Sequence, residues 1–322
     1  MKKDLSYLEI IKIVDEVKKY FEKQLEARLS LIKVQSPLFV KTDSGLQDAL
    51  SEIEKGVSFK KGSEKFEIVH SLAKWKREAL GKYEFPIHMG LYTDMKAIRK
   101  DEEVDDIHSL FVEQWDWEKV ISREDRTVDY LKEIVRCIYK SIRQTMVFIK
   151  QKYKFIAVDL PKSVYFITSQ DLEDMYPDIT PKEREELIVR DKKVVFIIGI
   201  GDKLKSGIYH DLRSPDYDDW SLDGDLLVFD KAIDKAIEIT SMGIRVDKKT
   251  LISQLEKAGC LDRLELPYHQ KICRGELPYT IGGGIGVSRI LMLLLEKTHI
   301  AEVQASSWDT KTLLKLKDKK IL

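Results

Sequence analysis

The stretch TIGGGIGVSRILMLLL, residues 280–295, joins a run of glycines to a strongly apolar segment that predicts a buried helix. Glycines let a backbone approach a nucleotide more closely than side chains would allow. Arg289 lies in the first turn of the expected helix, where its guanidinium could bind phosphate oxygens beside the positive helix end. Gly284, Gly286 and Arg289 are therefore candidates for binding a polyphosphate. A glycine-rich turn followed by a surface arginine is the simpler alternative.

This glycine pattern differs from the common nucleotide-binding motifs. Position 289 is not glycine, and the stretch lies near the end of the sequence, whereas a dinucleotide fingerprint follows the first strand. The sequence contains no Walker motif. If the stretch binds phosphate, it belongs to another kind of site.

Three segments rich in β-branched and aromatic residues, at 164–168, 194–201 and 226–230, predict strands. The intervals between them lack the regular strand-helix alternation of a doubly wound parallel sheet. We therefore expect an α+β fold with a mainly antiparallel sheet flanked by helices, in a single domain over residues 1–322.

Two long helices are expected, at about 5–29 and at 128–152. Ser6 and Glu9 have the spacing of a capping box at the start of the first helix. Apolar residues recur every three or four positions in both segments, which predicts one buried face on each helix. In the first helix the expected face consists of Leu8, Ile11, Val14, Phe21, Leu25 and Leu29.

Polar residues alternate with apolar ones in VEQWDWE, residues 112–118. A strand would place Gln114, Asp116 and Glu118 on one face, where they could line a pocket or face solvent. Arg99 ends another expected strand. The residues Ser71 and Lys76, in HSLAKWKREAL, and Asp48, in SGLQD, are not diagnostic by themselves.

Glu238 and Arg245 are seven residues apart in IEITSMGIRVD. A regular strand would direct them to opposite faces, because successive side chains alternate. Only a bulge or bend, for which Met242 and Gly243 are the candidates, would let both side chains converge.

The composition limits the classes of partner. Lys plus Arg and Asp plus Glu each number 55, so the chain has no overall positive field to attract nucleic acid. Cys137, Cys260 and Cys273 match no zinc or disulfide spacing, as expected in a reducing compartment. The N-terminus lacks a signal-peptide apolar core, and no run approaches the ~20 apolar residues that cross a bilayer. We expect a cytoplasmic protein with no membrane or nucleic-acid partner.

The order of these motifs resembles that of class II aminoacyl-tRNA synthetase catalytic domains: an arginine at a strand end, a Gln-x-Asp-x-Glu strand, an acidic strand and a late GGGIGVSR before a helix. The strings VHSLAKWKR, GLYTDMKAIR, EQWDWE, DYDDWS, ITSMGIRVD and TIGGGIGVSRILMLLL more narrowly resemble the aspartate–ammonia ligases. This resemblance extends from about Val34 to Trp308. It implies synthesis of asparagine from aspartate, ammonia and ATP through a β-aspartyl-adenylate, with release of AMP and pyrophosphate. It also implies a homodimer whose interface includes the segment around Pro37.

The resemblance further implies roles for the phosphate-binding residues. Arg99 would bind the α-phosphate of ATP, Arg289 the triphosphate tail, and Glu238 with Asp225 a Mg²⁺ ion. Carboxylates are suitable ligands for this hard cation. Ser288 stands where many class II synthetases have an acidic residue, so contacts to the triphosphate tail can differ in detail.

Roles for the amino-acid site follow from the same resemblance. Lys76 and Arg245 would bind the α-carboxylate of aspartate, with its β-carboxylate turned toward ATP. Asp116 and Asp219 would bind the α-ammonium group, and Ser71 and Gln114 complete the expected substrate site. Ammonium must lose a proton before it can attack, and Asp48 is the expected acceptor of that proton.

Two other functions share these features. One is a synthetase catalytic domain that charges tRNA, although the sequence leaves little room for a separate anticodon-binding module. The other is a non-catalytic regulatory paralogue that binds an amino acid. Glutamine as the nitrogen donor is disfavoured, because the first cysteine is Cys137, far from the N-terminus.

Overall fold

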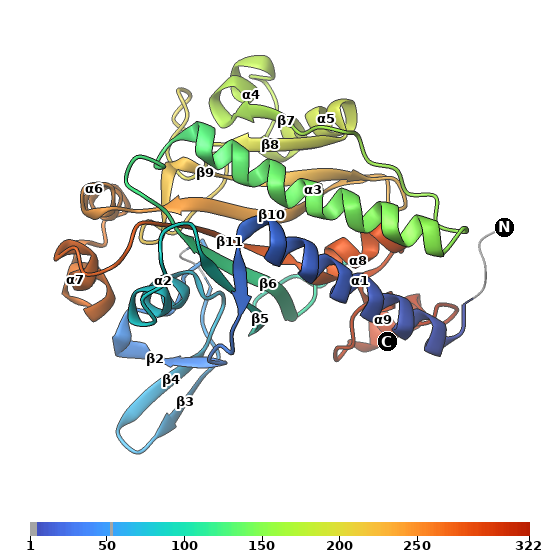
Figure 1. Ribbon diagram of the computed structural model, residues 1–322, viewed down its shortest axis with the longest axis horizontal. Helices are drawn as coiled ribbons and strands as arrows, with labels where there is room; N and C mark the ends of the chain where they lie inside the picture. Colours follow the sequence, from blue (N-terminus) through green and yellow to red (C-terminus); the bar gives the residue numbers. More distant parts are fainter. Residues whose placement is uncertain (1–4, 52–53) are drawn as a thin grey trace.

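The computed structural model describes residues 5–51 and 54–322, and in this part of the chain an eight-stranded sheet is the central element (Figure 1). Five of its neighbouring pairs are antiparallel, and only the two edge pairs are parallel. The expected α+β fold with a mainly antiparallel sheet is confirmed. The spatial order is β1 (Leu31–Lys33), β5 (Gly90–Ile98), β6 (Phe111–Val120), β11 (Thr280–Gly286), β10 (Lys235–Arg245), β9 (Asp218–Asp230), β8 (Val194–Ile198) and β7 (Tyr165–Thr168).

Three helices cover one face of this sheet: α1 (Tyr7–Leu29), α3 (Val128–Lys152) and α8 (Val287–Leu295), which contact one another (Figure 1). The main core lies between these helices and the sheet and includes Trp115 and Trp117 of β6. Both long helices were predicted from sequence with nearly these bounds.

The predicted capping box of α1 is present, with the Ser6 side chain accepting from the Glu9 backbone. The predicted buried face was partly wrong, because Leu8 and Ile11 are exposed. The buried stripe instead begins at Ile10 and continues through Ile13 and Val17 to Phe21, Leu25 and Leu29. In the first turns of α1, the prediction therefore named residues that lie beside the buried face and not on it.

The alternation of β6 leaves a polar row on the other face of the sheet. Since Trp115 and Trp117 enter the core, Gln114, Asp116 and Glu118 project to the opposite side. Helix α2 (Ala73–Lys82) packs there against β6. A smaller sheet, β2 (Phe39–Lys41), β4 (Glu64–Ile68) and β3 (Ser58–Lys61), projects from the body next to α2 (Figure 1).

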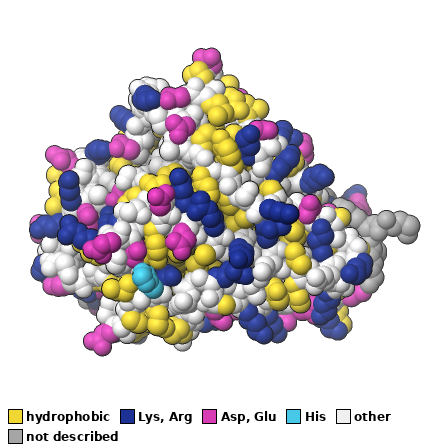
Figure 2. Space-filling model, turned by 45° about the horizontal axis from the view of Figure 1, so that its top comes forward, with side chains coloured by type: hydrophobic (Ala, Val, Ile, Leu, Met, Phe, Trp, Pro, Cys, Tyr) yellow, Lys and Arg dark blue, Asp and Glu magenta, His cyan; other side chains and the backbone are white. Residues whose placement is uncertain are grey.

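The remaining elements surround this framework. They are α4 (Ser169–Met175), α5 (Pro181–Lys192), α6 (Lys248–Ala258), α7 (Pro267–Cys273), α9 (Thr310–Lys315) and the 3₁₀ helices η1 (Thr42–Ser44), η2 (Leu261–Glu265) and η3 (Ile300–Glu302). Among the helices of residues 5–51 and 54–322, none is long and apolar enough to span a bilayer. Lys and Arg side chains are spread over the face shown in Figure 2, and Asp and Glu side chains lie among them.

Candidate functional site

A cavity of about 340 Å³ opens on the polar face of the sheet, between the central strands and the loops that follow β5 and β8. This volume is within the usual range for small-molecule sites. Ten of the thirteen residues predicted from sequence line this cavity. They are Ser71, Lys76, Arg99, Gln114, Asp116, Glu238, Arg245, Gly284, Gly286 and Arg289.

Two arginines lie at one end of the cavity. Arg99 directly follows β5, and Arg289 extends from the first turn of α8, where its Nη1 donates to the Glu238 carbonyl at 2.8 Å. Burial lowers the pKa of Arg99; Glu102 opposes this shift and Arg289 adds to it. The buried Nε of Arg99 has no hydrogen-bond partner among the described residues. Such an arrangement can bind an anion, because each guanidinium retains donors to offer.

The glycines of β11 serve the sheet as well as the cavity. A Cβ added at Gly284 would lie 2.3 Å from Oε1 of Gln114, and one at Gly282 would lie 2.0 Å from Oε2 of Glu118. Any side chain at these positions would displace residues of β6. The glycine run therefore makes room for Gln114 and Glu118, and its last residue, Gly286, also lines the cavity.

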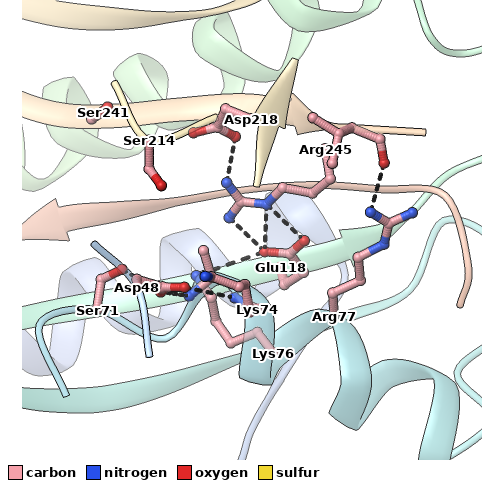
Figure 3. A network of polar contacts seen from close by, with 12 residues as sticks. Asp48, Ser71, Lys74, Lys76, Arg77, Glu118, Ser214, Asp218, Ser241 and Arg245 are labelled. Carbon is pink, nitrogen blue, oxygen red and sulfur yellow. Dashed lines mark hydrogen bonds and ion pairs between the residues drawn. The ribbon is translucent and has the colours of Figure 1, made fainter. Parts of the chain in front are cut away.

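A buried group of charges lies at the other end of the cavity (Figure 3). Lys76 extends from α2 and donates to Asp116 and, at 2.9 Å, to the Trp117 carbonyl. Arg245 donates to Glu118 at 2.7 Å and to Asp218. Two cations are thus shared among three carboxylates.

Burial and the neighbouring cations shift the pKa values of these carboxyl groups in opposite directions. It raises the pKa of Asp116 despite the attraction of Lys76, and it raises the pKa of Asp218 despite Arg245. Burial acts in the same direction on Glu118, but Arg245 outweighs it and leaves the pKa of Glu118 below its ordinary value. A cationic group of a ligand placed beside Asp116 and Asp218 would favour their ionised forms.

One bulge in β10 brings Glu238 and Arg245 to the same cavity. Between Glu238 and Thr240, β10 has one extra residue relative to β9, and this reverses the side-chain alternation. A second register shift, between Gly243 and Arg245, places its extra residues in β9 instead. The bend was expected at Met242 and Gly243, but β10 stays in unbroken register with β11 there, so the position of the expected bend was wrong.

Asp225 and Glu238, the two expected metal ligands, come from the neighbouring strands β9 and β10. Burial raises the pKa of Asp225 to about 7; Arg213, which is hydrogen-bonded to it, opposes the shift and Glu238 adds to it. The buried Oδ1 of Asp225 has no partner among the described residues. Glu238 lines the cavity, whereas Asp225 lies behind it.

These two carboxylates fit Mg²⁺, which binds through one or two carboxylates together with substrate phosphates. Within the described ranges, no group of three or more acidic, histidine or cysteine residues suited to a metal occurs. The partnerless oxygen of Asp225 and its repulsion from Glu238 are features that a divalent cation would relieve.

The expected position of Asp219 is wrong. Asp218 faces the cavity, and the next residue along a strand projects to the other side. The Asp219 carboxylate accepts hydrogen bonds from Arg126 at 2.9 Å and from the Ser221 hydroxyl at 2.7 Å. Asp218 takes its place as a carboxylate that can face a substrate ammonium group.

Asp48 also lies outside the cavity lining, fully buried behind Ser71. Its carboxylate accepts from the Ser71 hydroxyl at 2.5 Å, from the Ala73 amide at 2.6 Å and from the Lys74 amide at 3.4 Å. The N-cap residue of α2 is Leu72, which has no side-chain cap. Asp48 therefore caps α2 from a distant part of the sequence. The expectation that it contacts ammonium is not supported by this position.

We predict that Asp48→Asn lowers the free energy of unfolding by about 1–2 kcal/mol, because an amide group replaces the charge that faces the helix N–H groups. Denaturant unfolding would measure this change. Aspartate-dependent pyrophosphate exchange and amide formation should decline together. Selective loss of amide formation at unchanged stability would instead restore the sequence-based role of Asp48.

A family model described as aspartate-ammonia ligase matches residues 9–320. The chain belongs to the aspartate–ammonia ligase family. An aspartate–ammonia ligase from Clostridium perfringens is 56% identical over 308 residues, covering 95% of this chain and 92% of that protein. Another from Clostridium tetani is 52% identical over 310 residues, covering 95% and 91%.

Solved structures establish the fold relationship of this ligase family member. Asparaginyl-tRNA synthetase from Pyrococcus horikoshii, complexed with asparaginyl-adenylate, aligns with a TM-score of 0.67 at 13% identity, covering 92% of this chain and 68% of that one. The enzyme from Entamoeba histolytica, also with asparaginyl-adenylate, gives 0.65 at 16% identity, covering 94% and 71%. The ligase chain has the class II synthetase catalytic fold.

Sequence reasoning missed several residues of the ligase site, notably Arg213 and Asp218. Both lie in HDLRSPDYDDWS, where a single arginine stands among acidic residues, and that pattern could have indicated an internal ion pair. Asp216 of the same segment was also missed. Burial opposes the lowering of its pKa, but Lys74 and His269 outweigh it. The ion pair of Asp216 with Lys74, at 2.8 Å, ties this segment to the start of α2.

Proposed function

We propose that this chain synthesises L-asparagine from L-aspartate, ammonia and ATP through a β-aspartyl-adenylate, releasing AMP and pyrophosphate. The observation that carries the proposal is the meeting of Arg99, Glu238 and Arg289 in one cavity with the Lys76–Arg245 charge group. A phosphate-binding end and an amino-acid-binding end are both required when a carboxylate attacks a phosphorus atom. The membership in the aspartate–ammonia ligase family supports the choice of aspartate and ammonia.

ATP would bind at the arginine end. Arg99, with a free Nε–H, would contact the α-phosphate, and Arg289 would contact the β- and γ-phosphates. Fixed cationic donors stabilise the charge that develops on these oxygens as pyrophosphate leaves. Asp225 and Glu238 would hold Mg²⁺, which supplies further charge neutralisation at the phosphates when bound.

Aspartate would bind with its α-carboxylate at Lys76 and Arg245 and its β-carboxylate toward Arg99. Its α-ammonium group would balance the excess carboxylate charge at Asp116 and Asp218. This orientation is supported by the positions of Asp116 and Asp218, which line the cavity beside Lys76 and Arg245. Ser71 and Gln114 line the space between the two ends and can donate hydrogen bonds to the substrate.

We also propose a homodimer with the Pro37 segment in the interface. Several large apolar side chains near this segment are exposed, including Ile32, Leu38, Phe39 and Phe59. Phe39 and Phe59 contact each other on the small sheet, with ring centroids 5.1 Å apart. Neighbouring exposed apolar side chains of this kind are typical of an interaction surface.

The activity test combines the purified protein with aspartate, ATP, Mg²⁺ and ammonium. Asparagine, AMP and pyrophosphate should form in equal amounts, and omission of ammonium should leave aspartate-dependent pyrophosphate exchange. Charging of tRNA without asparagine synthesis would favour the synthetase alternative. Amino-acid binding without pyrophosphate release would favour a regulatory paralogue.

Lys76→Ala tests the α-carboxylate site. The Michaelis constant for aspartate should increase at least about tenfold, which corresponds to a loss of roughly 1.4 kcal/mol. The Michaelis constant for ATP should change little, because Lys76 lies at the far end of the cavity from Arg99 and Arg289. Steady-state kinetics of pyrophosphate exchange would measure both constants. Lys82→Ala, at an exposed position of the same helix, is the matched control. An unchanged aspartate constant would reject the assignment.

A further inference from the structure

A second, smaller cavity of about 110 Å³ adjoins the first. Three residues, Glu54, Arg99 and Glu102, line both cavities and form the wall between them. Its volume equals that of only a few water molecules, at about 30 Å³ each. The cavity is too small for a nucleotide and suits a small ligand.

His70 gives this cavity a distinctive polar group. The residue lies between β4 and α2 and is 2% exposed. Its ring interacts with the Asp48 backbone, but neither ring nitrogen makes a hydrogen bond of good geometry to a described residue. A buried polar atom without a full partner is costly and points to a bound water, a small ligand or a functional role. Burial lowers the pKa of His70 and Arg99 adds to the shift, whereas Glu54 and the interaction with the Asp48 backbone oppose it. The neutral ring can direct its N–H toward the Asp48 carbonyl and keeps one lone pair.

Three carboxylates, Glu54, Asp101 and Glu102, line the cavity together with three cations, Lys55, Arg99 and Lys100. Asp101 is paired with Lys100 through both oxygens, at 2.6 and 2.7 Å, and Lys55 is exposed to solvent. Glu54 accepts hydrogen bonds from the Ser51 amide and hydroxyl in its own loop. Glu54 and Glu102 are therefore the carboxylates that can attract a cation. Arg99 opposes such a cation until a phosphate group neutralises it.

We propose that this second cavity binds the nitrogen substrate as an ammonium ion, with His70 accepting one N–H bond and Glu54 and Glu102 balancing the charge. Hard metal cations prefer oxygen ligands, whereas an imidazole lone pair accepts readily from an N–H donor. The position also suits the reaction. Ammonia must reach an acyl group activated beside Arg99, and Arg99 is part of the shared wall. This inference rests on the proposed function, because it assigns a site to the nitrogen substrate of that reaction.

The variants His70→Phe and His70→Gln test the inference. His70→Phe removes the acceptor and keeps a ring, so the Michaelis constant for ammonium should increase at least tenfold. His70→Gln restores an oxygen acceptor, so its constant should lie between those of the wild type and His70→Phe. Aspartate-dependent pyrophosphate exchange, which needs no ammonia, should be retained in both and would show that the ATP and aspartate sites are folded. His299→Phe, at another buried histidine with a lowered pKa, is the control and should leave the ammonium constant unchanged.

The outcomes separate this inference from the proposed function. Retained exchange with an unchanged ammonium constant in His70→Phe would overturn the inference and leave the ligase proposal intact. Loss of exchange in both His70 variants would also overturn it, because His70 would then support the adenylation site. Absence of exchange in the wild-type protein would overturn the proposed function itself. If K⁺ inhibited the reaction by competing with ammonium at equal concentrations, the cavity would select its ligand by charge and size alone. This result would contradict the proposed hydrogen bond to the His70 imidazole.

Discussion

Replacing Arg99 by alanine is expected to reduce aspartate-dependent pyrophosphate exchange by about 10²–10³-fold, the usual effect of removing one fixed donor to a developing negative charge. The buried Nε of Arg99 has no partner among the described residues, so this guanidinium is available to a phosphate group. The loss should appear mainly in kcat, since the contact strengthens as charge accumulates at the α-phosphate. Initial-rate exchange kinetics over a range of ATP concentrations would measure it.

Arg274→Ala provides the control for Arg99→Ala. Arg274 is exposed and paired with Glu276 two residues away, outside the cavity, so its removal should leave exchange unchanged. A change in Arg99→Ala confined to the Michaelis constant for ATP would indicate ground-state binding only. A fully active Arg99→Ala variant would remove Arg99 from the phosphate site.

Replacing Arg245 by glutamine is expected to lower the free energy of unfolding by about 3–5 kcal/mol, because it leaves buried carboxylates without their cation. Arg245 contacts both Glu118 and Asp218, and all three side chains are buried. The aspartate site should be lost as well, since Arg245 is also the proposed ligand of the α-carboxylate. Denaturant unfolding and aspartate-dependent exchange would measure the two effects.

The pH dependence of the Arg245→Gln defect has a definite sign. In the wild type Arg245 holds the pKa of Glu118 below its ordinary value, against the effect of burial, so this contribution to stability is lost as pH falls. Without Arg245, burial would raise that pKa, and the variant would lose stability as pH rises through it. The difference in free energy of unfolding between the variant and the wild type should therefore become smaller as pH falls. Arg190→Gln, at an exposed surface pair, should leave the free energy of unfolding nearly unchanged at all of these pH values, because solvent screens such pairs.

Much of the secondary structure followed from local sequence. Helix α3 was predicted with its bounds, because its apolar period and its polar flanks are both encoded within 25 residues. The alternation of β6 correctly placed Gln114, Asp116 and Glu118 on one face for the same reason. The motif order also identified the family, which the family model confirms.

The direction of a side chain could not be predicted from local sequence where it depends on a neighbouring strand or helix. The bulge after Glu238 is defined against β9, and it redirects side chains without a clear local signal. Asp219 was chosen over Asp218 because DYDDWS alone does not say which carboxylate faces the sheet's polar side. Asp48 was predicted to contact ammonium, but it caps a helix that begins 25 residues later.

By itself the sequence determined the family, the fold class and ten of the residues that line the cavity, because periodicity, capping and long ordered motifs are local properties. Only the tertiary structure decided which carboxylates line the cavity and which form hydrogen bonds or ion pairs that stabilise the fold. The physical reason is that a buried charge is assigned by its nearest partners. For Asp48, Asp219 and Asp225 those partners are Ala73, Arg126 and Arg213, which the fold brings to them from other segments.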